Sequence, residues 1–387
     1  MNYHIMIDDK FIESFIDTAD NVASGKNVYV YTFLFPGKYV KRHQGISAPY
    51  GSEALQGVFN QLQKGDRLYV HWFDDRLLPY LNSVNREIPV NLFLWGGDFL
   101  EQTPELVRNN YGTVTRKLVE HTSRNSMFRR TANPIQWMRM LKDYFSYHSR
   151  MKALYERLYN NRKTFLSRLQ YMYHWNPDDI RIIENAYKVP VAFHDFFYDL
   201  GLQKISPDLN KPVSDVPLIW LGNSATPTNN HLEALQSLTT FIGEKYKIFA
   251  PLSYGLSWYA KEINRRAISL HGNSFNGLME FMPLDEYLKL IEQADVVIMN
   301  HHRSQAGANI FAFIYMGKKV YLSKKSSVHD LMVRNDILVF DADTISHSRY
   351  EDFIKPLSYS ERLNNSNKIL QMFSEDKRLS LLSGILN

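Results

Sequence analysis

The chain has 387 residues, of which 44% are hydrophobic and 22% are charged. This composition excludes an intrinsically disordered protein, and the length allows two domains of ordinary size. There is no cysteine, which excludes disulfides, thiolate metal sites and a cysteine nucleophile. No run of roughly 18 uncharged apolar residues is present, and the start MNYHIMIDDK lacks the basic and apolar regions of a signal peptide. We therefore expect a cytoplasmic protein.

The first 205 residues predict an α/β domain, because short β-rich runs alternate with helix-compatible stretches. We expect strands at 27–33, 66–73, 89–99 and 189–197, and helices at 53–63 and from Asn176-Pro177 onward. His71 and Asp98 lie at the ends of two of these strands, where such domains present chemistry. Either side chain can act as a general base towards a hydroxyl. Asp98 can equally satisfy amide groups of its own loop.

Positive charge is concentrated between Arg116 and Arg168. This segment has 13 Lys or Arg against 3 Asp or Glu, a net charge of +10, whereas the rest of the chain carries −5. We expect a basic helical segment over 116–172, with an apolar stripe made of Met151, Leu154, Leu158, Phe165, Leu169 and Met172. Three interpretations stay open: a helix whose stripe joins the core and whose charges are solvated, a surface for anionic lipid, and a nucleic-acid groove. Nucleic acid ranks last, because the rest of the chain is acidic and no nucleic-acid-binding motif accompanies the segment.

Residues 201–215 are typical of a linker, and a second α/β domain is predicted at 214–387. Strands and helices alternate regularly there, which favours a parallel sheet with crossover helices. The expected strands are 216–222, 246–254, 295–300 and 318–323, and the expected helices lie near 230–242, 257–269, 284–293 and 307–316. Two Rossmann-like domains predict a ligand cleft between them, at the carboxyl ends of the strands.

Two loops of the second domain carry groups suited to a diphosphate. In LGNSATPTNNH, Gly222 permits a sharp turn after a strand, and short polar side chains follow it. The loop at 301–309 leads into an apolar helix whose free N–H groups, with Arg303, can hold a pyrophosphate without a metal. Each loop can instead be a simple helix cap. His301 and His302 do not predict a metal site, because adjacent strand residues point in opposite directions.

Other acids of the second domain predict local structure. Asp285 is expected to cap the helix at 284–293. Asp341-Ala342-Asp343 is expected to form a turn rather than a divalent-cation site. We therefore expect no metal and no other cofactor.

Several motifs together resemble glycosyltransferase family 56. They are LGNSATPTNNH before a helix, Pro251-Leu252-Ser253-Tyr254, MPLDEYLKLIEQAD at 282–295 and Arg303-x-Gln305, with weaker likeness at His71 and Trp95-Gly96-x-Asp98. The family is typified by the enterobacterial 4-alpha-L-fucosyltransferase-like enzyme that moves 4-acetamido-4,6-dideoxygalactose (Fuc4NAc) from its dTDP-sugar to lipid II of the enterobacterial common antigen. The resemblance implies a GT-B fold, with the acceptor on residues 1–205, the nucleotide-sugar on 214–387, and no bound metal.

The resemblance and the loop chemistry together predict roles for individual residues. Asp98 and His71 are the candidate catalytic bases. The predicted donor-binding residues are Gly222, Asn223, Ser224, Asn229, His231, Tyr254, Arg303, Gln305, Gly307 and Asn309. The predicted membrane or acceptor residues of the basic segment are Arg150, Lys152, Arg157 and Arg168. Residues 225–228, 255–258 and 124–168 depart from the enterobacterial type, which leaves the sugar and the acceptor open.

We therefore predict a bacterial enzyme, peripheral on the inner face of the plasma membrane. It would transfer a deoxyamino sugar from a dTDP- or UDP-sugar to a polyprenyl-diphosphate-linked saccharide in surface polysaccharide synthesis. The alternative from another class is a non-catalytic nucleotide-sugar or glycan-binding protein of the same fold. No nucleic-acid partner is expected.

Overall fold

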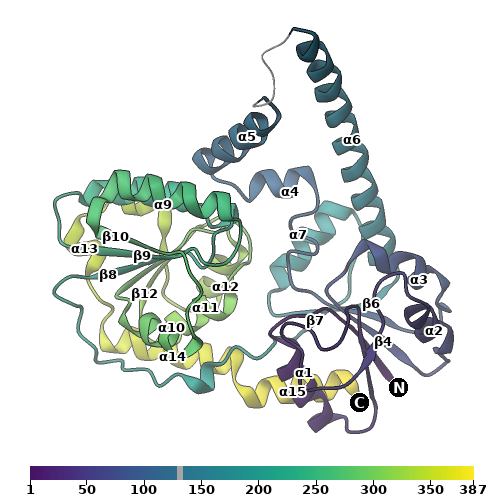
Figure 1. Cartoon of the computed structure of the whole chain (residues 1–387). Helices are drawn as coiled ribbons and strands as arrows, with labels where there is room; N and C mark the ends of the chain where they lie inside the picture. Colours follow the sequence, from purple (N-terminus) through teal and green to yellow (C-terminus); the bar gives the residue numbers. More distant parts are fainter. Residues whose placement is uncertain (129–133) are drawn as a thin grey trace. The chain divides into compact units, whose positions relative to one another are not determined.

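The computed structural model describes residues 1–128 and 134–387 and divides into two compact units (Figure 1). Unit 1 comprises Met1–Val107, Met138–Leu200 and Phe373–Asn387. Unit 2 comprises Arg108–Trp137 and Gly201–Met372. Each unit contains one parallel β-sheet with helices on both faces, which confirms the predicted pair of α/β domains.

Unit 1 is built on a seven-stranded parallel sheet in the order β3-β2-β1-β4-β5-β6-β7. Its strands are β1 (Asn2–Met6), β2 (Asn27–Tyr31), β3 (Ile46–Ser47), β4 (Arg67–His71), β5 (Val90–Phe93), β6 (Leu169–His174) and β7 (Phe193–Asp195). Its helices are α1 (Ile12–Val22), α2 (Glu53–Gln61), α3 (Leu78–Ser83), α6 (Pro134–Leu166), α7 (Pro177–Tyr187) and α15 (Glu375–Leu386). Helix α4 (Pro104–Asn109) leads from this unit into unit 2.

The two faces of the unit 1 sheet differ in chemistry, because successive strand residues point to opposite sides. One face is aliphatic and packs against α2, α3, α7 and the end of α6. The other face is aromatic and is covered by α1 and α15. Its rings are His4, Tyr29, Tyr31, Tyr69, His71, Phe93 and Tyr173. Large flat side chains therefore fill this side and extend to the carboxyl end of the central strands.

Unit 2 is built on a six-stranded parallel sheet in the order β10-β9-β8-β11-β12-β13. Its strands are β8 (Leu218–Leu221), β9 (Lys247–Pro251), β10 (Phe275–Leu278), β11 (Val296–Met299), β12 (Lys319–Leu322) and β13 (Phe340–Asp341). Its helices are α5 (Thr113–Phe128), α8 (His231–Leu238), α9 (Ser257–His271), α10 (Leu284–Gln293), α11 (Gly307–Tyr315), α12 (Ser327–Arg334), α13 (Tyr350–Ile354) and α14 (Tyr359–Phe373). Figure 1 shows α9 on one side of the sheet and α10 on the other. Trp220 fills the second side, where its ring lies 5.5 Å from Tyr287 of α10 and 5.3 Å from Phe313 of α11.

The domain boundaries differ from the expected 1–205 and 214–387 at two places. The last helix, α15, returns to unit 1: the Tyr69 hydroxyl donates to the Ile385 carbonyl at 2.9 Å, and Arg378 donates to Thr18 at 2.7 Å. Helix α5 belongs instead to unit 2. Its N-terminus is held by the Glu233 carboxylate, which accepts the amide hydrogens of residues 114 and 115 at 2.9 Å each.

The expected basic helical segment over 116–172 is helical only as far as Leu166 within the described residues. It contains α5 and α6, and residues 129–133 lie outside the described residues. Leu169 and Met172 belong to strand β6, where they pair with β5, so the last member of the expected stripe that lies in the helix is Phe165. Asp285 is a second correction: α10 begins at Leu284 after Pro283 as its cap, which places Asp285 inside the first turn. Asp341 forms the expected turn, because its carboxylate accepts the Asp343 amide hydrogen at 3.0 Å.

Candidate functional site

A glycine directly follows the carboxyl end of β8, and any other residue at this position would strain the backbone. Gly222 has a φ of +69°, in the left-handed region. A Cβ atom there would lie 2.7 Å from both Asn229 Oδ1 and His231 Nε2. The chain therefore turns sharply at Gly222 and lies directly against the two side chains that follow it.

The two predicted donor loops are joined by hydrogen bonds. Asn229 Oδ1 accepts from the Asn223 amide at 2.8 Å and from His301 Nε2 at 3.0 Å. Gln305 Nε2 donates to Asn223 Oδ1 at 3.1 Å, and the Thr228 hydroxyl donates to Gln305 Oε1 at 2.7 Å. The Asn229 amide nitrogen donates to Thr226 and also to Ser224, which is buried. The structure thus brings five of the ten predicted donor residues into one polar cluster: Gly222, Asn223, Ser224, Asn229 and Gln305.

His301 is a member of this cluster that the sequence considered only for a metal. Its Nε2 must carry the hydrogen, because its partners Asn223 Oδ1 and Asn229 Oδ1 can only accept. Burial, reinforced by the nearby Arg303, holds the pKa of His301 well below its usual value. The neutral ring leaves Nδ1 as a buried acceptor without a hydrogen-bond partner among the described residues.

His231 lies behind the loop rather than in it. It is fully buried, its Nδ1 lies 3.3 Å from the Tyr259 hydroxyl, and burial lowers its pKa to about 3. Its neutral ring packs against the turn at Gly222. Tyr254 does not join the cluster through its side chain, which is 71% exposed, but its carbonyl accepts the Ala225 amide hydrogen at 2.6 Å.

The helix that follows the second loop begins without a side-chain cap. Helix α11 begins at Gly307, and Ala306 before it has a φ of +58° and gives no side-chain cap. The first amides of a helix have no acceptor within it, and its N-terminus carries partial positive charge. Half-buried Arg303 donates to the Ser304 carbonyl at 2.6 Å, and Asn309 donates to the Tyr287 hydroxyl at 3.4 Å. Arg303, Gly307 and Asn309 thus lie on the same short loop and first turn.

In unit 1, Asp98 follows β5 and is fully buried. Its Oδ2 accepts the Phe73 amide hydrogen at 3.3 Å, while Oδ1 is buried and has no hydrogen-bond partner among the described residues. Burial raises the pKa of Asp98 from its usual 3.8 to about 6. Asp98 therefore combines an oxygen that no described residue occupies with a raised pKa, two properties that suit a general base.

His71 has a different environment from Asp98. Both ring nitrogens are used: Nδ1 lies 2.7 Å from the Tyr198 hydroxyl, and Nε2 lies 3.1 Å from His4 Nδ1. Burial, reinforced by His4, holds the pKa of His71 well below its usual value. The ring thus has no nitrogen directed at a ligand in this structure.

The predicted membrane residues separate into two groups. Arg150, Lys152 and Arg157 are exposed on α6. Arg168 instead donates to the carbonyl oxygens of Asn85 and Ile88, at 2.8 and 3.0 Å, so it ties α6 to its own unit. Arg162, also basic, is buried and donates to the Asp98 carbonyl and to Asp75, each at 2.8 Å. The end of the basic segment thus packs into unit 1, although the first interpretation expected its charges to be solvated, whereas Arg150, Lys152 and Arg157 are exposed.

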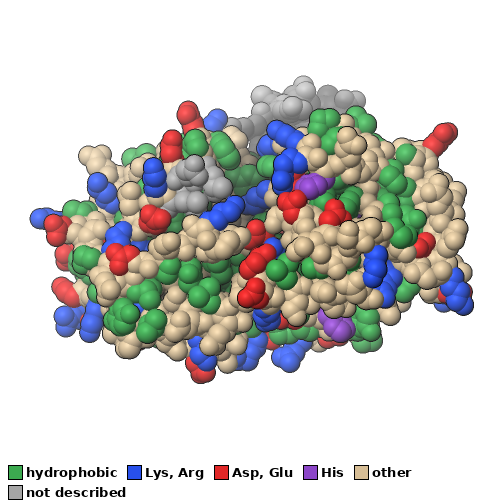
Figure 2. All heavy atoms as spheres, turned by 90° about the horizontal axis from the view of Figure 1, so that it is seen from below, with side chains coloured by type: hydrophobic (Ala, Val, Ile, Leu, Met, Phe, Trp, Pro, Cys, Tyr) green, Lys and Arg blue, Asp and Glu red, His purple; other side chains and the backbone are tan. Residues whose placement is uncertain are grey.

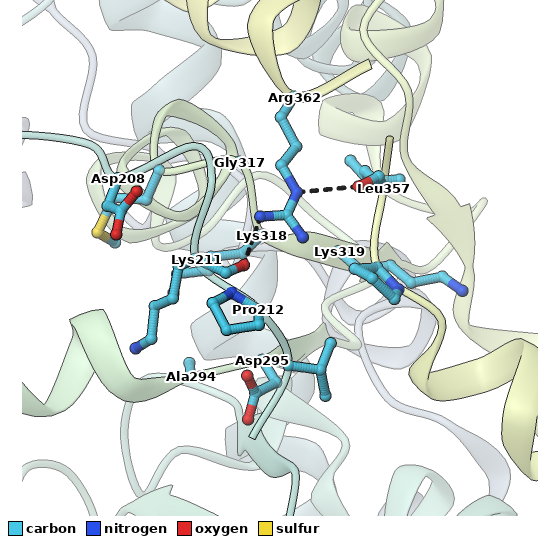
Figure 3. A pocket seen from close by; sticks show the side chains of 13 residues that line it. Asp208, Lys211, Pro212, Ala294, Asp295, Gly317, Lys318, Lys319, Leu357 and Arg362 are labelled. Carbon is cyan, nitrogen blue, oxygen red and sulfur yellow. Dashed lines mark hydrogen bonds between the residues drawn. The ribbon is translucent and has the colours of Figure 1, made fainter. Parts of the chain in front are cut away.

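A pocket of unit 2 lies at the amino ends of the strands, at the edge of the sheet opposite to the polar cluster (Figure 3). Arg362 donates there to the carbonyl oxygens of Leu209 and Lys211, at 3.1 and 2.7 Å. Lys211 and Lys318 both donate to the Glu292 carbonyl at 2.7 Å. Burial, and then Lys211, lower the pKa of Lys318 to about 8. Arg362 thus holds the backbone of the linker, and Lys211 ties the linker to α10, so we assign the pocket a structural role.

Two further observations concern the described residues as a whole. No helix within 1–128 and 134–387 is both long and apolar enough to cross a membrane. Among the side chains that the structure describes, no group of three His, Asp or Glu residues is arranged to hold a metal ion.

Comparisons with known proteins give the fold a name. At 9–12% identity these likenesses show the fold alone, and that fold is GT-B. The chain is similar to sucrose-phosphate synthase from Thermosynechococcus elongatus (TM-score 0.63, 9% identity, covering 99% of this chain and 97% of that chain). It is also similar to Anabaena HepE in complex with UDP and glucose (TM-score 0.63, 12% identity, 100% and 99%). A third is WaaG, a glycosyltransferase involved in lipopolysaccharide biosynthesis (TM-score 0.58, 9% identity, 100% and 98%).

The sequence family is identified separately. A model of the family described as 4-alpha-L-fucosyltransferase, glycosyl transferase group 56, matches residues 146–364, which is more than half of the chain. The match includes both loops of the polar cluster and all of α11. The chain therefore belongs to glycosyltransferase group 56 and is a glycosyltransferase with the GT-B fold.

Proposed function

We propose that the enzyme transfers a deoxyamino sugar from a dTDP- or UDP-linked donor to a polyprenyl-diphosphate-linked saccharide. The observation that carries the donor half is the polar cluster in which Asn223, Asn229 and Gln305 join two loops beside the start of α11. Similar structures add support, since HepE was solved with UDP and glucose. A transferase family argues against the alternative of a non-catalytic binding protein.

The donor chemistry follows from charge. The bond between the sugar carbon and the diphosphate oxygen breaks, and the nucleoside diphosphate leaves with the bonding electrons. We propose that Arg303 and the amides at Gly307 to Asn309, which lie on one loop and the first turn of α11, stabilise that negative charge. We propose that these groups act without a metal.

The acceptor chemistry needs a base for one hydroxyl. As the acceptor oxygen forms its bond to the sugar carbon, its proton passes to a carboxylate. We assign this role to Asp98, because its Oδ1 has no partner among the described residues and its pKa lies near 6. His71 is the weaker candidate, because both of its ring nitrogens are already hydrogen-bonded.

The lipid-linked acceptor is supported by the exposed cations of α6. Arg150, Lys152 and Arg157 present positive charge to solvent, and each such charge near an anionic bilayer contributes roughly 1 kcal/mol of attraction. On the face that Figure 2 shows, Lys and Arg are instead interspersed with Asp and Glu. The relation to WaaG, which is involved in lipopolysaccharide biosynthesis, favours the same class of product. We therefore propose peripheral attachment through α6.

The test is direct transfer. The full chain is incubated with radiolabelled dTDP- and UDP-sugars and with vesicles that contain polyprenyl-diphosphate saccharides. We expect label to enter the lipid fraction. Donor binding without transfer and without donor hydrolysis would contradict the proposal and restore the binding-protein alternative.

A further inference from the structure

Three half-buried aromatic side chains lie at the carboxyl edge of the unit 1 sheet. Trp72 follows β4, Trp95 follows β5, and Phe11 lies between β1 and α1. These three strands are neighbours in the order β1-β4-β5. The Trp72 and Trp95 rings are perpendicular with centroids 6.3 Å apart, and Phe11 meets Trp95 edge to face at 5.7 Å. Together the two tryptophans form a corner with two aromatic walls.

The corner depends on an unusual backbone. Trp72 has a φ of +77°, a left-handed conformation that is costly for a bulky residue and is found mainly where a function requires it. Gly97 lies against the tip of its ring: a Cβ at that position would come 2.9 Å from Trp72 Cη2. Any side chain at residue 97 would therefore displace Trp72. Gly97 directly precedes Asp98, and Asp98 accepts the amide hydrogen of Phe73, the residue after Trp72, at 3.3 Å. The loop of the candidate base therefore contacts the loop that carries Trp72.

A buried chain of hydrogen bonds fixes the second wall. The Trp95 indole N–H donates to the Tyr198 hydroxyl at 2.9 Å. The Tyr198 hydroxyl in turn donates to His71 Nδ1 at 2.7 Å. His71 Nε2 then donates to His4 Nδ1 at 3.1 Å, and His4 Nε2 donates to Asn27 Oδ1 at 3.3 Å.

The hydrogen bonds of this series can point in one direction only. An indole nitrogen can only donate, and an amide oxygen can only accept, so the two ends determine every hydrogen between them. The Asn27 amide cannot flip, because its nitrogen donates to the carbonyls of Ala19 and Ala23, at 3.0 and 3.1 Å. Burial lowers the pKa of His4 to about 3, so both rings stay neutral during catalysis. The chain therefore positions Trp95 and does not transfer protons.

From this arrangement we infer that Trp72 and Trp95 bind a sugar ring of the acceptor, with one hydroxyl directed to Asp98. This inference rests on the proposed transfer reaction and adds the residues that select its acceptor. The electron-rich faces of aromatic rings attract the polarised C–H groups on one side of a pyranose. Asp98 Oδ1, which is buried and has no hydrogen-bond partner among the described residues, suits one of its hydroxyls. A prenyl chain would fill two aromatic walls equally well but has no use for a buried carboxylate, so we assign the corner to the saccharide.

The first experiment measures steady-state kinetics of Trp95→Ala and Trp72→Ala with the lipid-linked acceptor. We expect the KM for the acceptor to rise about tenfold in each, equivalent to roughly 1.4 kcal/mol, while the KM for the donor and the rate of donor hydrolysis are unchanged. Tyr198→Phe should raise the KM for the lipid-linked acceptor by a smaller factor. Trp95 keeps its ring in this variant, but its indole N–H loses the hydroxyl to which it donates. Trp258→Ala in unit 2, where Trp258 is 36% exposed, is the matched control. An unchanged acceptor KM in both tryptophan variants would overturn the inference and leave the transferase proposal intact.

A second experiment needs no turnover. The full chain is titrated with millimolar methyl glycosides of glucose, galactose and N-acetylglucosamine, and tryptophan fluorescence is recorded. We expect at least one glycoside to change the emission of the unaltered protein and of Trp258→Ala, but not that of Trp95→Ala. Farnesyl diphosphate is the lipid probe. A response to farnesyl diphosphate and to none of the glycosides would assign the corner to the lipid instead and overturn the inference, whether or not transfer is observed.

Discussion

The carboxyl edges of the two sheets are built from opposite materials. In unit 2 the edge consists of small amides and hydroxyls around Asn223 and Asn229, followed by the free N–H groups of α11. In unit 1 the edge consists of aromatic side chains and one buried carboxylate, that of Asp98. The first provides hydrogen-bond donors and partial positive charge, and the second provides flat surfaces and a proton acceptor. Both sheets are parallel, yet they support two chemistries, because the residues that follow the strand ends differ.

The sharpest way to break this comparison is to remove the proton acceptor. Asp98→Asn keeps the size of the side chain but cannot accept a proton, and we expect kcat to fall by roughly 10³-fold. In the unaltered enzyme the rate should rise with pH through about 6 and then level, because Asp98 acts only when it is ionised. The measurement is transfer rate against pH in both proteins. Full activity of Asp98→Asn would return the assignment to His71.

The next test addresses the donor edge. Arg303→Ala should reduce kcat by roughly 10²-fold, because the charge on the leaving diphosphate loses its cation. Arg349→Ala, an Arg whose side chain is 76% exposed in unit 2, serves as the control for a lost positive charge. Circular dichroism should show both variants folded. Equal rates for the two variants would remove Arg303 from the mechanism.

A stability measurement sharpens the same contrast without any substrate. The folded-state pKa of Asp98, about 6, lies above the ordinary 3.8, so the charged form is disfavoured in the folded protein. The free energy of unfolding is therefore not reduced by Asp98 below about pH 4. It falls as the pH rises from about 4 to about 6, because the unfolded chain loses the proton first. Asp98→Asn should therefore increase the free energy of unfolding above pH 6 by at most about 3 kcal/mol, with the difference vanishing near pH 4. Urea denaturation at pH 4 and pH 7.5 provides the comparison; a destabilised variant at pH 7.5 would contradict it.

The smallest expected effects concern α6. Lys152→Gln and Arg157→Gln should each weaken binding to anionic vesicles about fivefold, corresponding to roughly 1 kcal/mol per charge, with stability unchanged. Arg168→Gln should instead lower stability, because Arg168 holds the carbonyls of Asn85 and Ile88. Vesicle sedimentation and thermal unfolding separate the two. If vesicle binding persists in a variant that carries both Lys152→Gln and Arg157→Gln, the membrane role of α6 is wrong and the transferase proposal is unaffected.

Local signals predicted much of the fold and of the donor edge. The strand before Gly222 and the apolar helix after Gln305 follow from hydrophobic runs and turn residues, and the structure joins the two loops. His301 was not predicted as a cluster member, because a His-His pair after a strand gives no information about which ring faces inward. Its partner Asn223 lies 78 residues away in the chain.

Long-range contacts explain what sequence patterns missed in unit 1. The burial of His71 depends on Phe15 and on Tyr198, which lies 127 residues later. Leu169 and Met172 fit a helical stripe by spacing, yet pairing with β5 makes them a strand. Local periodicity cannot determine which neighbour completes a sheet, because tertiary pairing overrides propensity.

The return of α15 to unit 1 has a consequence for how the protein is made. When a ribosome has released residues 1–372, unit 2 is complete, but the aromatic face of the first sheet still lacks one of its two covering helices. The N-terminal sheet therefore waits for the final 15 residues of the chain to finish its core. A stop codon or an affinity tag near residue 375 would therefore disturb the core of the domain that is synthesised first, and not the core of the domain that is synthesised last.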